Sequence, residues 1–356
     1  MNTKYITNPK SLISALADFK NNQIKSCVVL CASNSLKEAE KSYINILNES
    51  GLVYFGGVFP ALIFSSKMYE KGCILIGFDF HIEHQLIPLN ASPFQIKEQL
   101  SKLKVEPQES SAILSFISSS SRDKSSFLNT LFDRFGNQVN YLGAGCGDLS
   151  FGNTACIFSN SDIHHNTAIV ALINKSIEIN FTHGWEAQNQ TYKVTQVEKN
   201  EILSINWKPA LEVYLSLIQK ITSKKINENN LERYMKYYPF GIARLDSDYI
   251  IRDPYAYTDR GGILVVDQID EGEHIRLMQG SSNGLINACK SMYTEQEKLL
   301  VFDCISRLLF HDEQITQELQ AISKHQLTGA FSIGEIANRG SGVLEMYNKI
   351  VVTAKF

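Results

Sequence analysis

Residues 141–148 read YLGAGCGD, and two related glycine-bearing segments occur elsewhere in the chain, YFGGVFP at 54–60 and LTGAFSIGE at 327–335. Each segment follows a β-rich run and an amphipathic, helix-like stretch, and each precedes an apolar return strand. The β-rich runs lie at 27–31, 112–117 and 299–302, and the return strands at 73–78, 155–158 and 350–354. The sequence therefore predicts one βαββ unit that is used at least three times.

The alternation of predicted strands and helices continues along the whole chain. It predicts an α/β fold, with α+β as the alternative, in which mixed sheets are covered by helices. We expect two domains, one at 1–205 with two of the units and one at 206–356 with the third. The polar stretch SKKINENN at 223–230 is the strongest break in composition, and it predicts a linker or a surface loop.

Composition excludes several classes of partner. The chain has 356 residues, 44% of them hydrophobic, and a formal net charge of −3, which supplies no basic field for nucleic acid. No apolar run approaches the roughly 20 residues of a membrane span, and the N-terminus lacks the apolar core of a signal peptide. Seven cysteines without a framework spacing fit a reducing compartment. We therefore expect a cytoplasmic protein with neither nucleic acid nor a membrane as a partner.

The glycines of the repeated segments permit two interpretations. Glycine lets a backbone approach a ligand, so Gly143, Gly145 and Gly334 could line an anion-binding pocket at the strand ends. Alternatively, they make tight turns or close packing between layers. Neither a dinucleotide nor a P-loop fingerprint is present, and no His, Cys or Asp group has a closed metal-ligand spacing. We therefore expect no cofactor and no metal.

Several short motifs together resemble a known family. His183, Gly184 and Trp185, then Val194 with Thr195 and the run ALEVY at 210–214, are similar to the FIST N-terminal domain. The C-terminal FIST domain is matched in order by YPFG at 238–241, Arg252 to Pro254, Cys304 with Arg307, Gly334 with Glu335, and Tyr347 with Asn348. The first glycine segment departs from the family pattern, because it ends in Phe59 to Leu62 where family members often carry Gly-Glu. The resemblance covers nearly the whole chain.

The resemblance implies a sensory protein that binds a small ligand, with amino acids or related metabolites as the ligand class. FIST modules are often fused to output domains, and none is visible in this sequence. The family therefore implies signalling through a separate protein such as a kinase or a receptor. It implies binding rather than catalysis, and an enzyme is the alternative that we keep.

The strongest candidate for ligand contact is Arg252, which ends a predicted strand, where its guanidinium could hold a carboxylate in a bidentate fork. Glu335 and Asp148 end two of the glycine segments and could receive the ammonium group of an amino acid. The structural alternatives are an ion pair of Arg252 with Asp253 or Glu335, and carboxylates that cap local backbone amides. The complete candidate set is Arg252, Asp253, Glu335, Asp148, Arg307, Gly143, Gly145, Gly334, His183, Trp185 and Asn348.

Two further positions carry open alternatives. His183 and Trp185 predict either a stacking wall for a ligand or a structural histidine beside a packed tryptophan. Cys304 follows a predicted strand and precedes a helix that carries Arg307, an arrangement that lowers a thiol pKa. The enzyme alternative therefore uses Cys304 as nucleophile and Arg307 as anion holder, whereas the simpler interpretation of Cys304 is a small buried residue.

Overall fold

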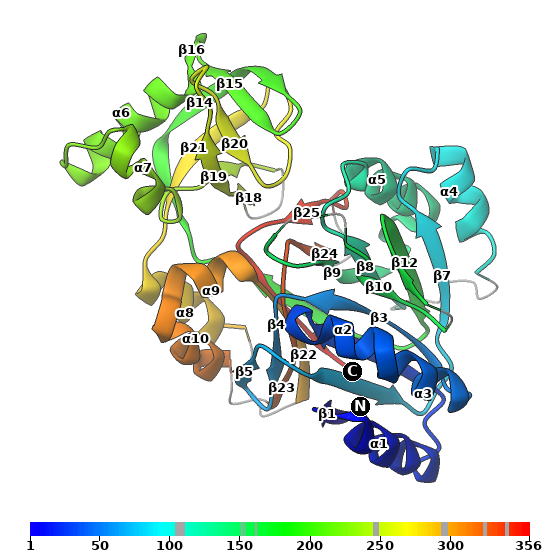
Figure 1. The fold of residues 1–356 in the computed structure, drawn as a ribbon. Helices are drawn as coiled ribbons and strands as arrows, with labels where there is room; N and C mark the ends of the chain where they lie inside the picture. Colours follow the sequence, from blue (N-terminus) through cyan, green and yellow to red (C-terminus); the bar gives the residue numbers. More distant parts are fainter. Residues whose placement is uncertain are drawn as a thin grey trace.

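The structure is a computed structural model, and it describes residues 1–103, 111–150, 152, 154–160, 162–244, 249–292, 298–322, 326–338 and 342–356. The chain forms a body of three similar units and one separate lobe, which lies at the upper left of Figure 1. We call residues 1–78 the first unit, 83–173 the second unit, and 178–182 together with 282–356 the third unit. Residues 186–279 are the lobe.

The elements follow the same order in each unit. The first unit contains β1 (Asn2–Ile6), α1 (Pro9–Asn21), β2 (Ser26–Ala32), α2 (Leu36–Glu38), α3 (Ile44–Glu49), β3 (Val53–Phe59), β4 (Ala61–Phe64), β5 (Lys67–Tyr69) and β6 (Cys73–Phe78). The second contains β7 (Glu83–Pro88), α4 (Pro93–Leu100), β8 (Ala112–Ser118), α5 (Lys124–Phe135), β9 (Asn140–Cys146), β10 (Ile157–Phe158), β11 (Ile163–His164) and β12 (Thr167–Ile173). The third contains β13 (Glu178–Thr182), α8 (Ser282–Lys290), β22 (Lys298–Cys304), α9 (Ile305–His311), α10 (Ile315–Ile322), β23 (Gln326–Ser332), β24 (Glu335–Asn338), β25 (Met346–Tyr347) and β26 (Val351–Lys355).

The three sheets share one strand order, namely β1-β6-β2-β3-β10-β11, β7-β12-β8-β9-β24-β25 and β13-β26-β22-β23-β4-β5. In each sheet a parallel pair lies next to an antiparallel return strand. The last two positions of each sheet are filled by a hairpin from another unit, so that the units exchange hairpins in a closed cycle. The predicted α/β class with mixed sheets is confirmed, and the repeat is longer than the predicted βαββ.

The repeated glycines explain how the parallel strands approach each other. Gly56, Gly143 and Gly329 lie opposite Val29, Ser115 and Val301 in equivalent registers. A Cβ at these glycines would lie 1.8, 2.0 and 1.7 Å from the carbonyl oxygens of those three neighbours, so only glycine fits. The glycines therefore sit inside strands, where the interpretation as close packing describes them, and not at strand-end turns.

An aromatic cluster joins the units at the centre of the body. Phe59, Phe116 and Phe302, one from each unit, are buried, and their ring centroids lie 5.6 to 6.1 Å apart. Helices cover the outside of the body, with α4 and α5 on the second unit and α8 to α10 on the third (Figure 1). The sheets consequently bury their inner faces against one another and their outer faces under helices.

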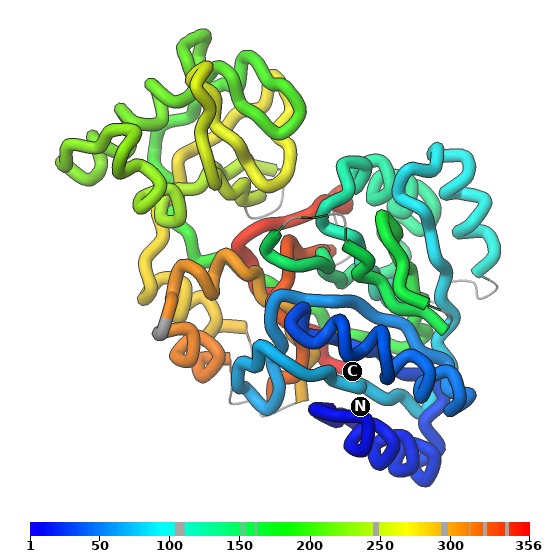
Figure 2. The backbone as a smooth tube through the Cα atoms, viewed as in Figure 1, coloured from blue at the N-terminus to red at the C-terminus, as the bar shows by residue number. Residues whose placement is uncertain are grey.

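The lobe is an insertion between β13 and α8 of the third unit, and Figure 2 shows the chain passing from the body into it and back. It contains β14 (Glu186–Glu198), β15 (Glu201–Ile205), β16 (Lys208–Pro209), α6 (Ala210–Thr222), α7 (Glu228–Met235), β17 (Phe240–Ile242), β18 (Ile250–Arg252), β19 (Pro254–Tyr257), β20 (Ile263–Val265) and β21 (His274–Gln279). The predicted domain boundary at residue 205 lies between β15 and β16, which pair with each other. Of the polar stretch at 223–230, residues 223–227 connect α6 to α7, and residues 228–230 form the start of α7. Within the described residues, every helix is too short or too polar to cross a lipid bilayer.

Candidate functional site

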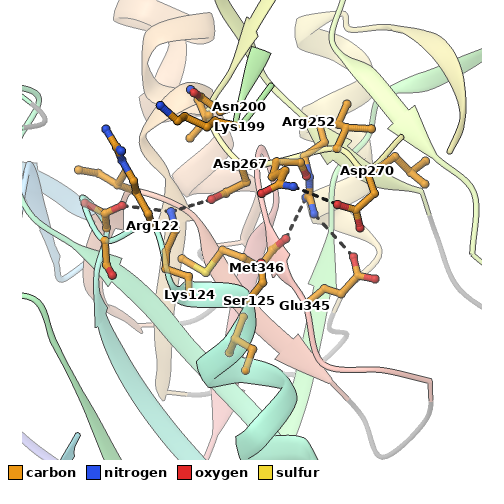
Figure 3. A pocket seen from close by; sticks show the side chains of 18 of the residues that line it. Arg122, Lys124, Ser125, Lys199, Asn200, Arg252, Asp267, Asp270, Glu345 and Met346 are labelled. Atoms are coloured by element: carbon orange, nitrogen blue, oxygen red, sulfur yellow. Dashed lines mark hydrogen bonds and ion pairs between the residues drawn. The ribbon is translucent and has the colours of Figure 1, made fainter. Parts of the chain in front are cut away.

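A cavity of about 750 Å³ lies between the lobe and the second unit (Figure 3). The body contributes the segment 119–122 that follows β8, the start of α5 and the segment 344–346. The lobe contributes the β14–β15 turn, β18 and the segment 266–270. The carboxyl end of a parallel strand and the start of the following helix thus face the lobe. Ligand sites in α/β proteins commonly use this position.

Most charged groups of the cavity are paired with each other. Five basic and four acidic side chains of the described residues line it. Lys124 Nζ lies 2.7 Å from Asp267, and Arg244 lies 3.0 Å from both Glu273 and Glu345.

Two of the basic side chains that line the cavity are not paired with an acidic side chain of the described residues. In the part of the chain that the structure describes, Arg122 and Lys199 have no carboxylate partner. Their charges are therefore available to an anion that enters the cavity.

Arg252 is the one residue of the predicted set that lines this cavity. Its Nε donates to the Gln268 carbonyl at 3.0 Å, and its Nη1 donates to the Met346 carbonyl at 2.9 Å. Its Nη2 lies 3.6 Å from Glu345. Arg252 therefore holds the lobe against β25 and forms part of the wall, and little of its fork is left for a ligand.

Asp267 links the cavity to Asn348. The Asn348 amide donates to the Asp267 carboxylate at 2.6 Å, while Lys124 pairs with its other oxygen. Burial alone would raise the pKa of Asp267, but Lys124, Arg252 and the hydrogen bond from Asn348 together hold it below its usual value. Asp267 stays ionised, so it keeps Lys124 in place beside the cavity. Asn348 itself lies behind the wall.

Arg307 lies on α9 in a separate buried cluster within the third unit. Its guanidinium forms two 2.8 Å bonds with Glu318 and donates to the carbonyls of His183 and Lys349. Burial would raise the pKa of Glu318, but Arg307 and a hydrogen bond with His311 lower it to about 2. With no exposed surface and its donors in use, Arg307 holds structure together, and its predicted contact with a ligand stays a prediction.

Asp253 occupies the start of α9 as an internal anion. Its carboxylate accepts a hydrogen bond from the Ser306 hydroxyl at 2.5 Å and lies 3.0 Å from Lys349 Nζ. The Trp185 ring lies near two cations, 5.4 Å from Arg307 and 5.2 Å from Lys349, and the Trp185 backbone N–H donates to His183 Nδ1. These contacts match the structural interpretation of His183 and Trp185.

Cys304 and Glu335 are neighbours in the same buried region. Burial and the nearby Glu335 raise the pKa of the Cys304 thiol, which is the reverse of the activation that the enzyme alternative requires. Burial also raises the pKa of Glu335, whose carboxyl accepts a hydrogen bond from Ser332 at 2.8 Å. In both groups the buried environment favours the protonated form.

The remaining predicted residues lie away from the cavity. Asp148 accepts a hydrogen bond from the Ser150 N–H at 2.7 Å and so shapes a local turn. Gly143 and Gly145 lie within β9, and Gly334 occupies a turn with φ +85°. The described residues contain no group of three or more His, Cys, Asp or Glu side chains that could hold a metal ion.

The sequence reasoning missed the basic residues of the cavity. Lys124, Arg122 and Lys199 belong to no motif, although Arg122 directly follows the serine run at 118–121 and Lys124 stands two residues later. That run at the end of a predicted strand was the available signal. Lys199 offered none, because the fold alone brings the β14–β15 turn to this place.

Comparison with protein families gives two adjoining matches. The model of the FIST N domain matches residues 26–208, and the model of the FIST C domain matches residues 210–338. Both ranges reach into the lobe: the first ends in β16, and the second begins at the first residue of α6. A search of curated proteins returned no match.

Proposed function

The chain belongs to the FIST family of sensory signal-transduction domains, and on that premise we propose that it binds a small ligand in the cavity between the lobe and the second unit. One observation carries the proposal: Arg122 and Lys199 line this cavity without an acidic partner among the described residues. A cavity of about 750 Å³ also lies within the usual range for small-molecule sites, about 300 to 1,000 Å³.

The ligand class that we propose is an amino acid or a related small carboxylate. In Figure 3, Arg122, Lys124 and Lys199 lie to one side of the cavity, and Asp270 and Glu345 lie to the other. A zwitterionic ligand could direct its carboxylate to the basic side and its ammonium group to the acidic side. Arg252 would then shape the wall between them.

Signalling would follow from the position of the cavity. Its walls belong to the body and to the lobe, so a ligand that contacts both stabilises the arrangement in which they are close. We propose that a separate cytoplasmic protein, such as a kinase or a receptor, reads this arrangement. Binding is preferred to catalysis because the Cys304 thiol is buried and its pKa is raised.

A thermal-shift screen against amino acids, dipeptides and small carboxylates tests the proposal. A true ligand raises the midpoint of unfolding by mass action. Asn129 is an exposed residue of α5 that lines the cavity, so Asn129→Trp should fill the space and abolish the shift. Asp133→Trp, also exposed on α5 but outside the cavity, should retain it. A panel without any hit, or an equal shift in both variants, would overturn the proposal.

A further inference from the structure

In the third unit, the Asp253 carboxylate lies at the start of α9, the helix that follows β22. The corresponding place in the second unit is the start of α5, the helix that follows β8. We infer that this place is a carboxylate subsite, formed by Ser120, the first turn of α5, Arg122 and Lys199. The inference rests on the proposed function, because it assigns one end of the same cavity. The group that is recognised is a carboxylate, and both the body and the lobe contribute residues that recognise it.

The equivalence follows from the registers of the parallel strands. Ser115 lies opposite Gly143 in the β8–β9 pair, and Val301 lies opposite Gly329 in the β22–β23 pair. Both glycines receive a carbonyl oxygen where a Cβ would be, which fixes the same alignment independently of sequence identity. Five residues after Ser115 and Val301 stand Ser120 and Ser306; Ser306 lies in the first turn of α9, whereas Ser120 lies in the turn between β8 and α5, four residues before the helix.

The third unit shows what this position holds. The Ser306 hydroxyl donates to a carboxylate oxygen of Asp253, and Lys349 Nζ lies 3.0 Å from the other oxygen. Asp253 comes from the lobe, at the end of β18. A serine at the start of a helix and a nearby cation therefore already hold a carboxylate in this molecule.

In the second unit the corresponding segment, which leads from β8 into α5, opens into the cavity. Ser120 lines the cavity, and among the described residues its hydroxyl has no partner. Ser119 also lines it, is only 9% exposed, and has a hydroxyl without a partner in the described part of the chain. No side chain caps the 12-residue helix α5, because Asp123 makes no capping bond. The free N–H groups and the partial positive charge of a helix start favour an anion here.

Arg122 and Lys199 supply the charge that Lys349 supplies in the third unit. Arg122 belongs to the body, whereas Lys199 lies in the β14–β15 turn of the lobe. The neighbouring Asn200 amide donates to the Val265 carbonyl at 3.1 Å, which fixes this turn on the lobe. A carboxylate between Arg122 and Lys199 would thus connect body and lobe and stabilise the closed cavity.

Acetate is the probe for this subsite, and the readout is NMR of protein labelled with 15N-serine. At constant ionic strength, acetate should shift the amide resonances of Ser119, Ser120 and Ser121 saturably. Arg122→Gln and Lys199→Gln should each lower the affinity for acetate by about tenfold, which is the effect expected for the loss of one charge-assisted hydrogen bond. Lys193→Gln, an exposed lysine of β14 outside the cavity, should leave it unchanged.

Other outcomes overturn the subsite. They are the absence of any shift, equal acetate binding in all variants, or preferential binding of inorganic phosphate, which would assign a phosphoryl group in place of the carboxylate. The outcome also separates the two proposals. If Asn129→Trp abolishes the thermal shift of a ligand from the screen while acetate leaves the serine resonances unchanged, the proposal for the cavity is supported and the proposal for the carboxylate subsite fails. If acetate binds as expected and the screen yields no ligand, the subsite stands and the proposed function fails.

Discussion

At the scale of single residues, the family motifs and the cavity use different side chains. The motif residues Arg307, Asp253 and Trp185 contact one another or close neighbours in the buried region where the lobe meets the third unit. Their polar atoms are mostly satisfied inside the protein. The side chains with unused charge, Arg122 and Lys199, lie outside every motif that the sequence offered. The family motifs therefore mark the contact between the lobe and the body, and they do not mark the basic residues of the cavity.

Glu335→Gln tests the protonation of a buried carboxyl. Because burial raises the pKa of Glu335 in the folded state only, folding keeps a proton that the unfolded chain releases above a pH of about 4.3. The contribution of this group to wild-type stability is complete below that pH and is lost as the pH rises toward the raised folded pKa. Glutamine, which resembles the protonated acid, should make the protein more stable than wild type at pH 7.

The advantage of Glu335→Gln should shrink as the pH falls toward 5, by at most about 1.4 kcal/mol per pH unit. Urea unfolding at several pH values measures it. The exposed Glu212→Gln substitution on α6 is the matched control. A free-energy difference from wild type that does not depend on pH would show that Glu335 is ionised in the fold.

Cys304 should resist alkylation in the folded protein. The side chain is 2% exposed, and its raised pKa leaves little thiolate near neutral pH. We expect iodoacetamide to label Cys304 only after unfolding, as followed by mass spectrometry of its peptide. Rapid labelling of the native protein near neutral pH would revive the enzyme alternative.

At the scale of elements, the local sequence pattern predicted the repeated unit, but it could not predict which strands pair across different units. The return strand β6 and the parallel partners β2 and β3 follow from glycine position and apolar runs within about 50 residues. The pairing of β4 with β23 joins residues more than 260 positions apart, and no local propensity reports it. β4 pairs with β23 in the sheet of the third unit. The sequence around the first glycine segment therefore could not show which part of the molecule residues 61–64 contact.

Gly143→Ala should be costly because the clash involves backbone. The new Cβ would lie 2.0 Å from the Ser115 carbonyl oxygen, which cannot move without breaking the β8–β9 pairing. We expect the free energy of unfolding to fall by at least about 3 kcal/mol in chemical denaturation. Gly152→Ala, whose new Cβ would meet only the Ser150 hydroxyl at 3.2 Å among the residues that the structure describes, should change it by less than about 0.5 kcal/mol. Similar losses in both variants would argue against the close approach of the strands.

At the scale of the whole molecule, the lobe is placed by contacts with the third unit and leaves a cavity beside the second. The sequence predicted a large C-terminal domain, but the lobe is an insertion within the third unit, and only the long-range pairing of β13 with β26 shows this. The cavity lies between parts that are distant in sequence, so its lining residues could not be grouped from the sequence.

Arg252→Ala should loosen the lobe without unfolding the body. It removes the hydrogen bonds to the Gln268 and Met346 carbonyls and leaves buried acceptors unsatisfied, at a cost of about 1 to 3 kcal/mol. Amide hydrogen exchange should accelerate in segments 266–270 and 344–346 and stay unchanged in β2 and β3. Uniform acceleration across the chain would mean that Arg252 supports the whole fold and not this joint.

Isothermal titration calorimetry with the best ligand of the thermal-shift screen tests the central claim most directly. Wild type and Asp133→Trp should bind the ligand with the same affinity, and Asn129→Trp should bind it at least about tenfold more weakly, because its side chain fills the cavity. Equal affinity in all three proteins would contradict the claim that the cavity between the lobe and the second unit is the ligand site.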